Sequence, residues 1–279
     1  PTTRKPMELV GDASYLVTGG LGGFGLRTAE WLASKGARHL VLISRSGPSS
    51  DTAKEAIARL QQQGVKVHAA ACDITDKKAL VGLFADIGKS LPPLKGIVHA
   101  ATVINDGLIR NMDADQIRSV LAPKAMGAQH LHEMTLGTTL DFFVLFSSAT
   151  TLFGNPGQGN YVAANACLEA LAKYRRANGL AATCVRWGAI DDVGFLARNE
   201  KIKDALQGRM GGSALHSAIA LDALESMLTA DRSGLGVIEL DWKALSRFLP
   251  SAASPKFSEL ALHAGDNDAD EEDSGDIQR

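Results

Sequence analysis

The amino-acid sequence predicts a doubly wound α/β domain, in which helices cover both faces of a parallel sheet. Seven short apolar runs alternate with longer segments of helical periodicity, and this alternation is typical of βα units. The apolar runs are continuous, as expected for strands that are buried on both faces. A glycine-rich segment, TGGLGGFG, joins the first apolar run to the first helical segment at residues 18–25.

The alternation also gives the order of the elements. Strands are expected at residues 14–18, 39–44, 66–71, 96–101, 141–147, 181–186 and 235–240. Helices are expected at residues 23–36, 51–63, 76–89, 113–135, 159–178 and 215–230. Residues 188–213 break the rhythm with several glycines and mixed polarity, so we expect a mobile lid there. Ligands of such sheets bind at the carboxyl ends of the strands.

Composition fits one large domain and narrows the function. The chain has 279 residues, of which 45% are hydrophobic, and a net charge of −2. Its apolar runs are shorter than the ~18 residues of a membrane span, and the sequence shows neither a secretory signal nor a basic, aromatic-interleaved patch for nucleic acid. The three cysteines lack metal-ligand spacing. We expect them to be reduced core residues of a cytoplasmic protein without a metal site.

Both ends differ from the body of the chain. Residues 266–279 contain seven acidic residues and one basic residue, a composition typical of disorder. We therefore expect residues 1–11 to be a linker, residues 12–248 to be the domain and residues 249–279 to be an acidic, disordered linker. The two ends resemble cuts through a longer polypeptide.

The glycine-rich segment predicts a dinucleotide site. Its glycines allow the backbone to approach a pyrophosphate, and the following helix offers N–H groups and the positive end of its dipole. The expected cofactor contacts in this segment come from Thr18, Gly19, Gly20, Leu21, Gly23, Phe24 and Gly25.

The end of the second strand distinguishes between two nicotinamide cofactors. Enzymes that use NAD usually have an acidic residue there, which binds the ribose hydroxyls. This chain has Ser44 and Arg45, and the first acidic residue is Asp51. An arginine pairs with a 2′-phosphate, so Arg45 favours NADPH, although a solvated surface arginine would give the same sequence.

The ends of the third and fourth strands complete the expected cofactor site. Asp73 and Ile74 follow the third strand, where adenine should lie, although Asp73 would also suit a helix cap. His99, Ala100 and Ala101 end the fourth strand, beneath the nicotinamide ribose. We assign no acid–base role to His99, because a satisfied core histidine is the more common case.

Tyr161 is the candidate proton donor for the reduction of a carbonyl. It lies thirteen residues after Ser148 and four before Asn165. A tyrosine with a pKa of about 10 needs roughly 4 kcal/mol of phenolate stabilisation to act near neutral pH. Asn165 carries no charge, and Lys173 lies too far along the same helix. Lys124, on the preceding helix, is the remaining candidate, although a surface lysine is equally compatible with the sequence.

Ser148 and Asn165 are expected to support that proton transfer. Ser148 closes the fifth strand and would bind the substrate carbonyl by a hydrogen bond. Asn165 shares a helix face with Tyr161, where it would hold a water molecule or orient Lys124. A plain helix-face asparagine remains an alternative.

The assembled motifs resemble the ketoreductase domain of type I polyketide synthases and of the related animal-type fatty acid synthase, within the short-chain dehydrogenase/reductase superfamily. The resemblance covers about residues 13–248. It is carried by TGGLGGFG, HLVLISRSG, CDITD, IVHAATVIND, LAPKAMGAQHLHEMT, DFFVLFSS, NPGQGNYVAANACLEALAKYRR and RWGAIDDVG.

The resemblance implies a Rossmann fold and NADPH-dependent reduction of a β-ketoacyl chain on the phosphopantetheine arm of an acyl carrier protein. Lys124, Ser148, Tyr161 and Asn165 fall on the four catalytic positions of this family, in which lysine has left the tyrosine helix and asparagine occupies its place. Trp187 and Gly188, in the last motif, fall on the cofactor site. The competing hypotheses are an inactive remnant domain and a stand-alone dehydrogenase for another carbonyl substrate.

The resemblance also bears on stereochemistry. Family members that give the D-configured alcohol usually have a Leu-Asp-Asp triplet, which is Ile104-Asn105-Asp106 in this chain. Members that give the L-alcohol usually have tryptophan where this chain has Phe153. Both features favour the D product, although Thr102 replaces a usual glycine. Pro156 and Gln158 are expected to shape the mouth through which the thioester enters.

Further domains are implied as partners. The family's reductase normally has a degenerate structural subdomain just upstream, whereas only a short segment precedes the first strand here. We expect that subdomain to have been cut away or to be separated by an inserted enoyl reductase in the parent synthase.

Overall fold

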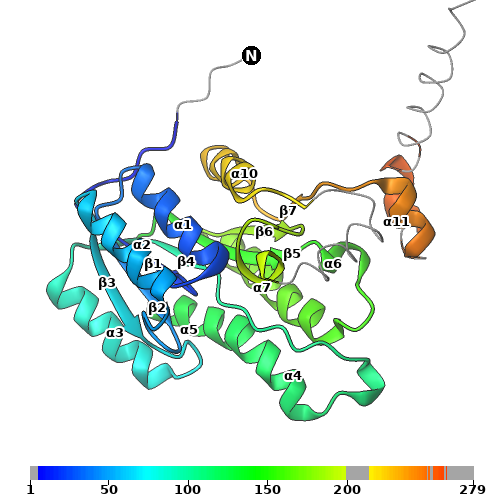
Figure 1. Ribbon diagram of the computed structural model, residues 1–279, viewed down its shortest axis with the longest axis horizontal. Helices are drawn as coiled ribbons and strands as arrows, with labels where there is room; N and C mark the ends of the chain where they lie inside the picture. Colours follow the sequence, from blue (N-terminus) through cyan, green and yellow to red (C-terminus); the bar gives the residue numbers. More distant parts are fainter. Residues whose placement is uncertain (1–5, 199–213, 250, 252–253, 261, 263–279) are drawn as a thin grey trace, which may run out of the picture.

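The sheet has seven strands, all parallel, in the order β3-β2-β1-β4-β5-β6-β7 (Figure 1). The computed structural model describes residues 6–198, 214–249, 251, 254–260 and 262. The strands are β1 (Ser14–Thr18), β2 (His39–Ser44), β3 (Lys66–Ala71), β4 (Leu94–His99), β5 (Phe142–Ser148), β6 (Thr183–Trp187) and β7 (Leu235–Val237). The order turns back at β1 and β4, so the predicted doubly wound fold is confirmed.

Two helical layers cover the sheet (Figure 1). One face is covered by α1 (Gly23–Ser34), α2 (Asp51–Gln62) and α10 (Ser217–Thr229). The other is covered by α3 (Lys77–Ser90), α5 (Gly127–Met134) and α7 (Gly159–Ala177), with α4 (Ala114–Leu121) beside α7. Each face has its own apolar core, which explains why the central strands read as continuous apolar runs.

The expected helix at residues 113–135 is divided into three parts. A π-helical turn, η2 (Ala122–Met126), separates α4 from α5. Pro123 lies in the first part of this turn and has no N–H to donate to the preceding turn. The N–H of Gly127 instead reaches back five residues to the carbonyl oxygen of Ala122. The chain therefore continues in the same direction through one widened turn.

Other elements differ from the sequence prediction in smaller ways. β4 lies two residues earlier than expected, and the edge strand β7 is only three residues long. The prediction did not include five short helices: η1 (Ile109–Asn111), α6 (Thr150–Phe153), α8 (Gly194–Ala197), α11 (Trp242–Phe248) and η4 (Pro255–Phe257). Segments this short contain too few residues to show a helical period.

Arg175 anchors the end of α7 inside the core. It is 1% exposed, and its guanidinium lies 3.8 Å from the ring centroid of Phe143. Its Nε donates to the carbonyl oxygen of Ala181 and its Nη1 to Nδ1 of His132, at 3.0 and 3.1 Å. Burial lowers the pKa of Arg175 to about 10. Ring, carbonyl and imidazole contacts thus replace the water that a buried guanidinium loses.

Part of the expected N-terminal linker is packed against the domain. The N–H of Met7 donates to Glu225 on α10, and the N–H of Leu9 donates to the carbonyl oxygen of Lys35. Lys35 and Glu225 also form an ion pair at 2.6 Å. The described residues of this segment therefore lie along α1 and α10.

Residues beyond the expected domain boundary at residue 248 are also packed. Leu249 and Phe257 are buried in a small apolar cluster with Phe153, Leu245 and Ala149. Hydrogen bonds reinforce this packing. Ser251 Oγ and Lys256 Nζ donate to the carbonyl oxygens at the end of α6, at 2.6 and 2.9 Å. The acidic run that suggested a linker begins only after these apolar residues.

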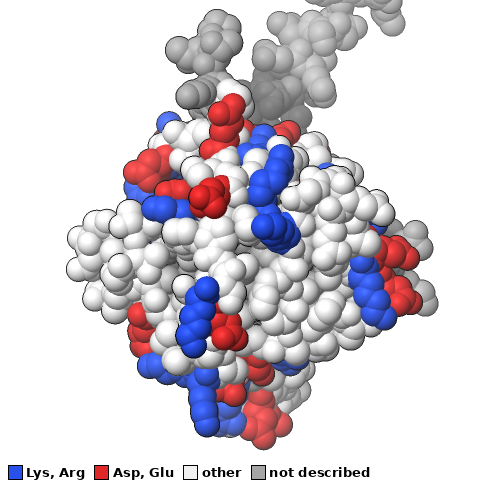
Figure 2. All heavy atoms as spheres, turned by 90° about the vertical axis from the view of Figure 1, so that its left-hand side faces the viewer, with Lys and Arg blue, Asp and Glu red and all other residues white. Residues whose placement is uncertain are grey.

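The face of the molecule in Figure 2 carries mixed charge. Basic side chains lie beside acidic ones, and uncharged surface separates the groups. Glu30 on α1, for example, pairs with both Arg27 and Arg59.

Cys167 is exposed on α7, contrary to the core position expected for it. Within the described residues, none of the helices has the length and hydropathy needed to cross a membrane.

Phe257→Ala should destabilise the domain, because residues past 248 belong to its packed part. Removing this buried ring should lower the free energy of unfolding by roughly 3 kcal/mol in a urea titration. Leu260→Ala is the matched control, since Leu260 is 52% exposed, and it should change stability by less than about 0.5 kcal/mol. Equal, small effects of both substitutions would show that the segment contributes nothing to folding.

Candidate active site

The glycine-rich segment forms a tight loop between β1 and α1 that leaves no room for a side chain at Gly19 or Gly20. Gly19 has a φ of +68°, and a Cβ atom there would lie 3.0 Å from the backbone of Ala101. A Cβ atom on Gly20 would lie 2.7 Å from the carbonyl oxygen of Val17. The N-cap of α1, Gly22, offers no side chain to the first N–H groups of the helix. These features fit a pyrophosphate held by backbone N–H groups.

Three aromatic rings fix the loop to the ends of β5 and β6. Phe24 stacks on Phe146 with centroids 5.1 Å apart, and Trp187 meets both rings edge-on at 5.2 and 5.3 Å. The Phe24 and Trp187 side chains therefore pack against each other. The N–H of Gly188, after β6, donates to the carbonyl oxygen of Val237, which joins this corner to β7. Leu21 is buried in the same face of the core.

The end of β2 presents a free cation. Arg45 is exposed and has no hydrogen bond or ion pair with any described residue, so its guanidinium is available to a ligand. The neighbouring Ser44 closes its own turn by donating to the carbonyl oxygen of Gly47 at 3.2 Å.

The structure at the end of β3 tests the helix-cap role that the sequence left open for Asp73. Asp73 accepts two hydrogen bonds from Thr75, both 2.8 Å long, and so holds a turn. The cap of α3 is Asp76, which accepts from Lys78 and Ala79, and the helix-cap role suggested for Asp73 is wrong. Ile74 is buried against Gly127, where an added Cβ would lie 2.7 Å from it.

The end of β4 is tied to the glycine loop through Thr18. The N–H of Ala100 donates to the carbonyl oxygen of Thr18 at 3.1 Å. The N–H of Ala101 donates to the hydroxyl oxygen of the same residue at 3.4 Å. His99 is fully buried and also contacts Thr18. The two alanines thus form a wall against Gly19.

Lys124 projects from the π-helical turn into the protein. It is 2% exposed. Its Nζ donates to the carbonyl oxygen of Phe146 at 2.8 Å and lies 5.5 Å from the ring centroid of Tyr161. Burial lowers the pKa of Lys124 to about 8. The amine therefore lies inside the site beside the candidate proton donor.

The phenol of Tyr161 is not acidified in this structure, contrary to expectation. Burial raises the pKa of Tyr161, while hydrogen bonds with Asn165, Thr102 and Ser148 lower it by less. The physical reason is the burial of the phenol, whose effect outweighs that of these hydrogen bonds. Thr102, noted in the sequence only as a departure from the family pattern, thus contributes a hydroxyl at the phenol.

Ser148 is prepared to donate a hydrogen bond. Its Oγ accepts from the N–H and the hydroxyl of Thr150, at 3.2 and 3.0 Å. Because its lone pairs are engaged, its own hydrogen is left for the phenol or a ligand. On α7, Asn165 Nδ2 donates to the carbonyl oxygen of Tyr161 at 2.8 Å, and its buried Oδ1 has no hydrogen-bond partner among the described residues.

A partly buried carboxylate on the catalytic helix escaped the sequence analysis. Glu169 accepts from Ser147 and Thr151 at 2.9 and 2.6 Å, and it pairs with Arg186 at 2.5 Å. Burial alone would raise the pKa of Glu169, but these hydrogen bonds hold it below its ordinary value. The spacing of four residues from Asn165 was the available signal, because it puts Glu169 on the face of α7 that carries Tyr161.

Two loops are bound together at the outer side of the site. Gln158 Nε2 donates to a carboxylate oxygen of Asp106 at 2.9 Å, and the N–H of Gly107 donates to Gly157 at 2.8 Å. The carbonyl oxygen of Asn105 accepts from Asn160 Nδ2, also at 2.9 Å. Pro156 is exposed on the same loop. The structure therefore brings together four of the five residues expected to control the substrate.

Phe153, the fifth of these residues, lies elsewhere. It is 7% exposed and packs in the apolar cluster with Leu245, Leu249 and Phe257. The ring of Phe153 on α6 therefore packs against the C-terminal segment.

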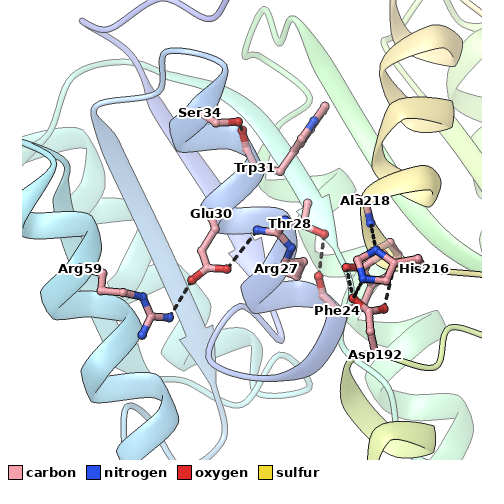
Figure 3. A network of polar contacts seen from close by, with 11 residues as sticks. Phe24, Arg27, Thr28, Glu30, Trp31, Ser34, Arg59, Asp192, His216 and Ala218 are labelled. Carbon is pink, nitrogen blue, oxygen red and sulfur yellow. Dashed lines mark hydrogen bonds and ion pairs between the residues drawn. The ribbon is translucent and has the colours of Figure 1, made fainter.

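The segment after β6 approaches the glycine loop before leaving the described part of the chain. A Cβ atom on Gly23 would lie 3.0 Å from the Cα of Gly194. Asp192 accepts from the N–H and hydroxyl of Ser217 at 2.8 and 2.6 Å, and it pairs with His216 (Figure 3). This segment is thus fastened to α10. Residues 199–213 of the expected lid lie outside the described residues.

The described residues include no group of three or more His, Cys, Asp or Glu side chains arranged to hold a metal ion. The site consists of backbone N–H groups, hydroxyls, one amide, one amine and one guanidinium. The amine, two hydroxyls and amide surround a phenol, and the backbone N–H groups lie in the glycine loop after β1, with β4 between β1 and β5. Such a set suits a nucleotide beside a proton-transfer centre.

Comparison with known proteins gives the same picture. The family model of the KR domain matches residues 13–192. The polyketide synthase GfsA of Streptomyces halstedii is 40% identical over 252 residues, which is 89% of this chain and 3% of that protein. The reducing polyketide synthase PKS1 of Cochliobolus heterostrophus is 38% identical over 214 residues, covering 77% of this chain and 8% of that synthase.

A solved structure of an A1-type ketoreductase is 38% identical, with a TM-score of 0.85, and the match covers 95% of this chain and 55% of that chain. The chain thus spans about half of this solved relative and less than a tenth of the two synthases.

Lys124→Met should stabilise the protein at neutral pH. The difference between an ordinary lysine pKa of 10.5 and a pKa of about 8 corresponds to about 3 kcal/mol. A cation whose pKa is lowered by folding destabilises the folded state fully below its folded pKa, and this effect fades between pH 8 and 10.5. The gain should therefore be present in urea titrations at pH 7 and absent near pH 10.5.

Lys173→Met serves as the control, since this lysine is exposed on α7. It should change stability by less than about 0.5 kcal/mol at both pH values. A gain for Lys124→Met that does not vary with pH would contradict the lowered lysine pKa.

Proposed function

The chain belongs to the ketoreductase (KR) domain family of polyketide synthases, and we propose that it reduces a β-ketoacyl thioester to a β-hydroxyacyl thioester with NADPH. The single observation that carries this proposal is the meeting of Lys124, Ser148 and Tyr161 around one point. A cation, a hydroxyl and a phenol converge there. These are the groups that a carbonyl reduction requires.

Bound NADPH would supply the hydride, and the chain supplies every other component of the reaction. The Ser148 hydroxyl donates a hydrogen bond to the ketone oxygen and orients the carbonyl. Tyr161 transfers its phenolic proton to the same oxygen as negative charge develops there. Ser148, Thr102 and Asn165 then stabilise the phenolate, since their hydrogen bonds already lower the pKa of Tyr161.

Lys124 and Asn165 complete the proton transfer. The Lys124 amine has one described acceptor, the Phe146 carbonyl oxygen, whereas an ammonium has three hydrogens to donate. The unpartnered Oδ1 of Asn165 offers a buried acceptor on the tyrosine helix. The amine would stabilise the phenolate electrostatically, and Asn165 would hold the water molecule or the amine that returns a proton to it.

The preference for NADPH is proposed from Arg45. The exposed guanidinium follows the strand that carries the adenosine ribose in this fold. Its neighbours in the turn are the hydroxyl groups of Ser44 and Ser46. A 2′-phosphate would accept charge-assisted hydrogen bonds from the guanidinium and a hydrogen bond from Ser46, since the Ser44 hydroxyl donates to Gly47. Asp73 and Ile74 would bind the adenine at the end of the next strand.

We also propose that the product has the D configuration and that the acyl chain arrives on a carrier protein. The loop that contains Asn105 and Asp106 is bound to Gln158 beside the catalytic helix, so it limits the directions from which a thioester reaches Ser148. The phosphopantetheine arm of an acyl carrier protein would deliver the thioester past this loop. Other domains of a multidomain synthase are the further partners that we propose.

The proposal is tested by incubating the protein with a short β-ketoacyl thioester and NADPH. We expect oxidation of NADPH in step with the formation of one β-hydroxyacyl thioester, identified as the D enantiomer by chiral chromatography. NADPH binding without turnover would indicate an inactive remnant. Turnover of simple ketones in preference to thioesters would indicate a stand-alone dehydrogenase.

Tyr161→Phe should abolish proton donation while leaving the shape of the site intact. We expect kcat to fall by roughly 100-fold or more, because general acids contribute about that much, while NADPH affinity measured by fluorescence stays nearly unchanged. Tyr174→Phe is the matched control, because Tyr174 lies on the same helix and is 58% exposed. Retained turnover in Tyr161→Phe would show that another group gives the proton.

Arg45→Asp should weaken NADPH binding far more than NADH binding. Replacing a cation by an anion beside the 2′-phosphate should raise the NADPH Kd by roughly 10- to 100-fold, as charged hydrogen bonds contribute about 1.5–3 kcal/mol. Arg247→Asp is the control, since Arg247 is an exposed arginine on α11. Equal losses for both cofactors would refute the phosphate assignment.

A further inference from the structure

We propose that His99 is a positioning residue for Lys124. Its neutral ring lies between Thr18 and the backbone of Lys124 and holds the widened helical turn that presents the lysine amine to Tyr161. This inference rests on the proposed function for its consequence in catalysis. Its structural content does not depend on that function, because it concerns the placement of one side chain.

The hydrogen bonds of His99 fix its tautomer. Its Nε2 lies 3.1 Å from the carbonyl oxygen of Lys124, and its Nδ1 lies 2.7 Å from the hydroxyl of Thr18. A carbonyl oxygen only accepts, so Nε2 must carry the hydrogen, and Nδ1 must then accept from the Thr18 hydroxyl. One neutral form satisfies both ring nitrogens.

The ring stays neutral throughout the working range of an enzyme. Burial and the nearby Lys124 amine lower the pKa of His99 to about 3. His99 therefore does not exchange protons with the site. Its contribution is mechanical, through two buried hydrogen bonds.

The turn that carries Lys124 depends on contacts from outside the helix. A widened turn contains an extra residue, which rotates the side chains beyond it by about 100° relative to a continuous α-helix. The direction of the Lys124 amine thus depends on the turn remaining wide. His99 donates to the Lys124 carbonyl in this turn, and its Cε1 faces Gly127 directly after the turn, where an added Cβ atom would lie 3.3 Å away.

Thr18 extends this contact to the cofactor loop. Its hydroxyl donates to His99 and accepts from the N–H of Ala101, and Gly19 follows it directly in the chain. His99, Thr18 and Lys124 are all nearly or fully buried. A continuous line of buried hydrogen bonds therefore joins the loop expected to hold pyrophosphate to the turn that aims the amine.

The experiment compares His99→Leu with His99→Gln in the full 279-residue chain. Leucine removes both hydrogen bonds and leaves the Thr18 hydroxyl and the Lys124 carbonyl unsatisfied. Glutamine offers one N–H donor and one oxygen acceptor in place of Nε2 and Nδ1. His132→Leu is the matched control for lost stability, because His132 is also buried but bonds Arg175.

The first measurement is independent of activity. The protein without nucleotide is treated briefly with acetic anhydride, and modification of Lys124 is followed by mass spectrometry. The wild-type amine should react slowly, since it is 2% exposed. We expect His99→Leu to increase its rate of modification roughly tenfold or more, which corresponds to about 1.4 kcal/mol of protection, while His99→Gln and His132→Leu leave it near the wild-type rate.

The second measurement is catalysis. With NADPH and a short β-ketoacyl thioester, kcat of His99→Leu should fall roughly tenfold or more with little change in KM, the pattern of a lost transition-state interaction. His99→Gln should restore most of kcat. His132→Leu should lower Tm without this change in kcat. A Lys124 amine in His99→Leu that stays as protected as in the wild type would overturn the proposal, whatever the activity.

The two proposals fail in different ways. If the wild-type protein shows no turnover, the reductase assignment fails, while the modification of Lys124 still decides the role of His99. If His99→Leu does not fold, Thr18→Val replaces it, because valine keeps the volume of threonine but removes the hydroxyl that fixes the ring. Unchanged protection of Lys124 in Thr18→Val would then count against His99 as the support of the turn.

Discussion

Burying the amine of Lys124 costs free energy, because a charged group loses its water, and the arrangement of the site follows from how this cost is limited. The amine keeps one hydrogen bond to the end of β5 and lies over the ring of Tyr161. Its pKa falls toward neutrality, so the group need not carry a full charge at all times. A lysine on the surface would have been cheaper to hold but too well solvated to influence a phenol.

The catalytic helix α7 receives comparable support on its inner face. Tyr161, Asn165 and Glu169 follow one another at intervals of four residues, and each faces the end of β5 or its own neighbour on the helix. The ion pair between Glu169 and Arg186 joins the helix to β6, further along the helix than Tyr161. These contacts hold α7 in a fixed position against β5 and β6. The transfer of a hydride and a proton to adjacent atoms requires such fixed positions.

Much of this arrangement was predictable from the sequence. Continuous apolar runs predicted the strands. The glycines predicted the loop, because only glycine tolerates the contacts of Gly19 and Gly20. The spacing of Tyr161 and Asn165 placed them on one helix face, since a helix has a regular period, and the family resemblance placed Ser148 with them.

The widened turn was not predictable, because a proline within a helical pattern equally suggests a kink or an end. Glu169 was not singled out, since an acidic residue on a helix usually lies on the surface. The packing of Phe257 was not predicted, because an acidic run follows it in the sequence. The position of Phe153 was not predicted either, because α6 has only four residues.

The close approach of Gly23 to Gly194 has a consequence for the exchange of parts between synthases. Both residues have positive φ angles, +51° and +78°, and a methyl group on Gly23 would press on the backbone of Gly194. The two segments therefore form one mechanical unit, although 171 positions of sequence separate them. In a chimera whose crossover falls between these glycines, the two segments would come from different proteins and would not be matched to each other. Junctions outside the pair would transfer both segments from one protein.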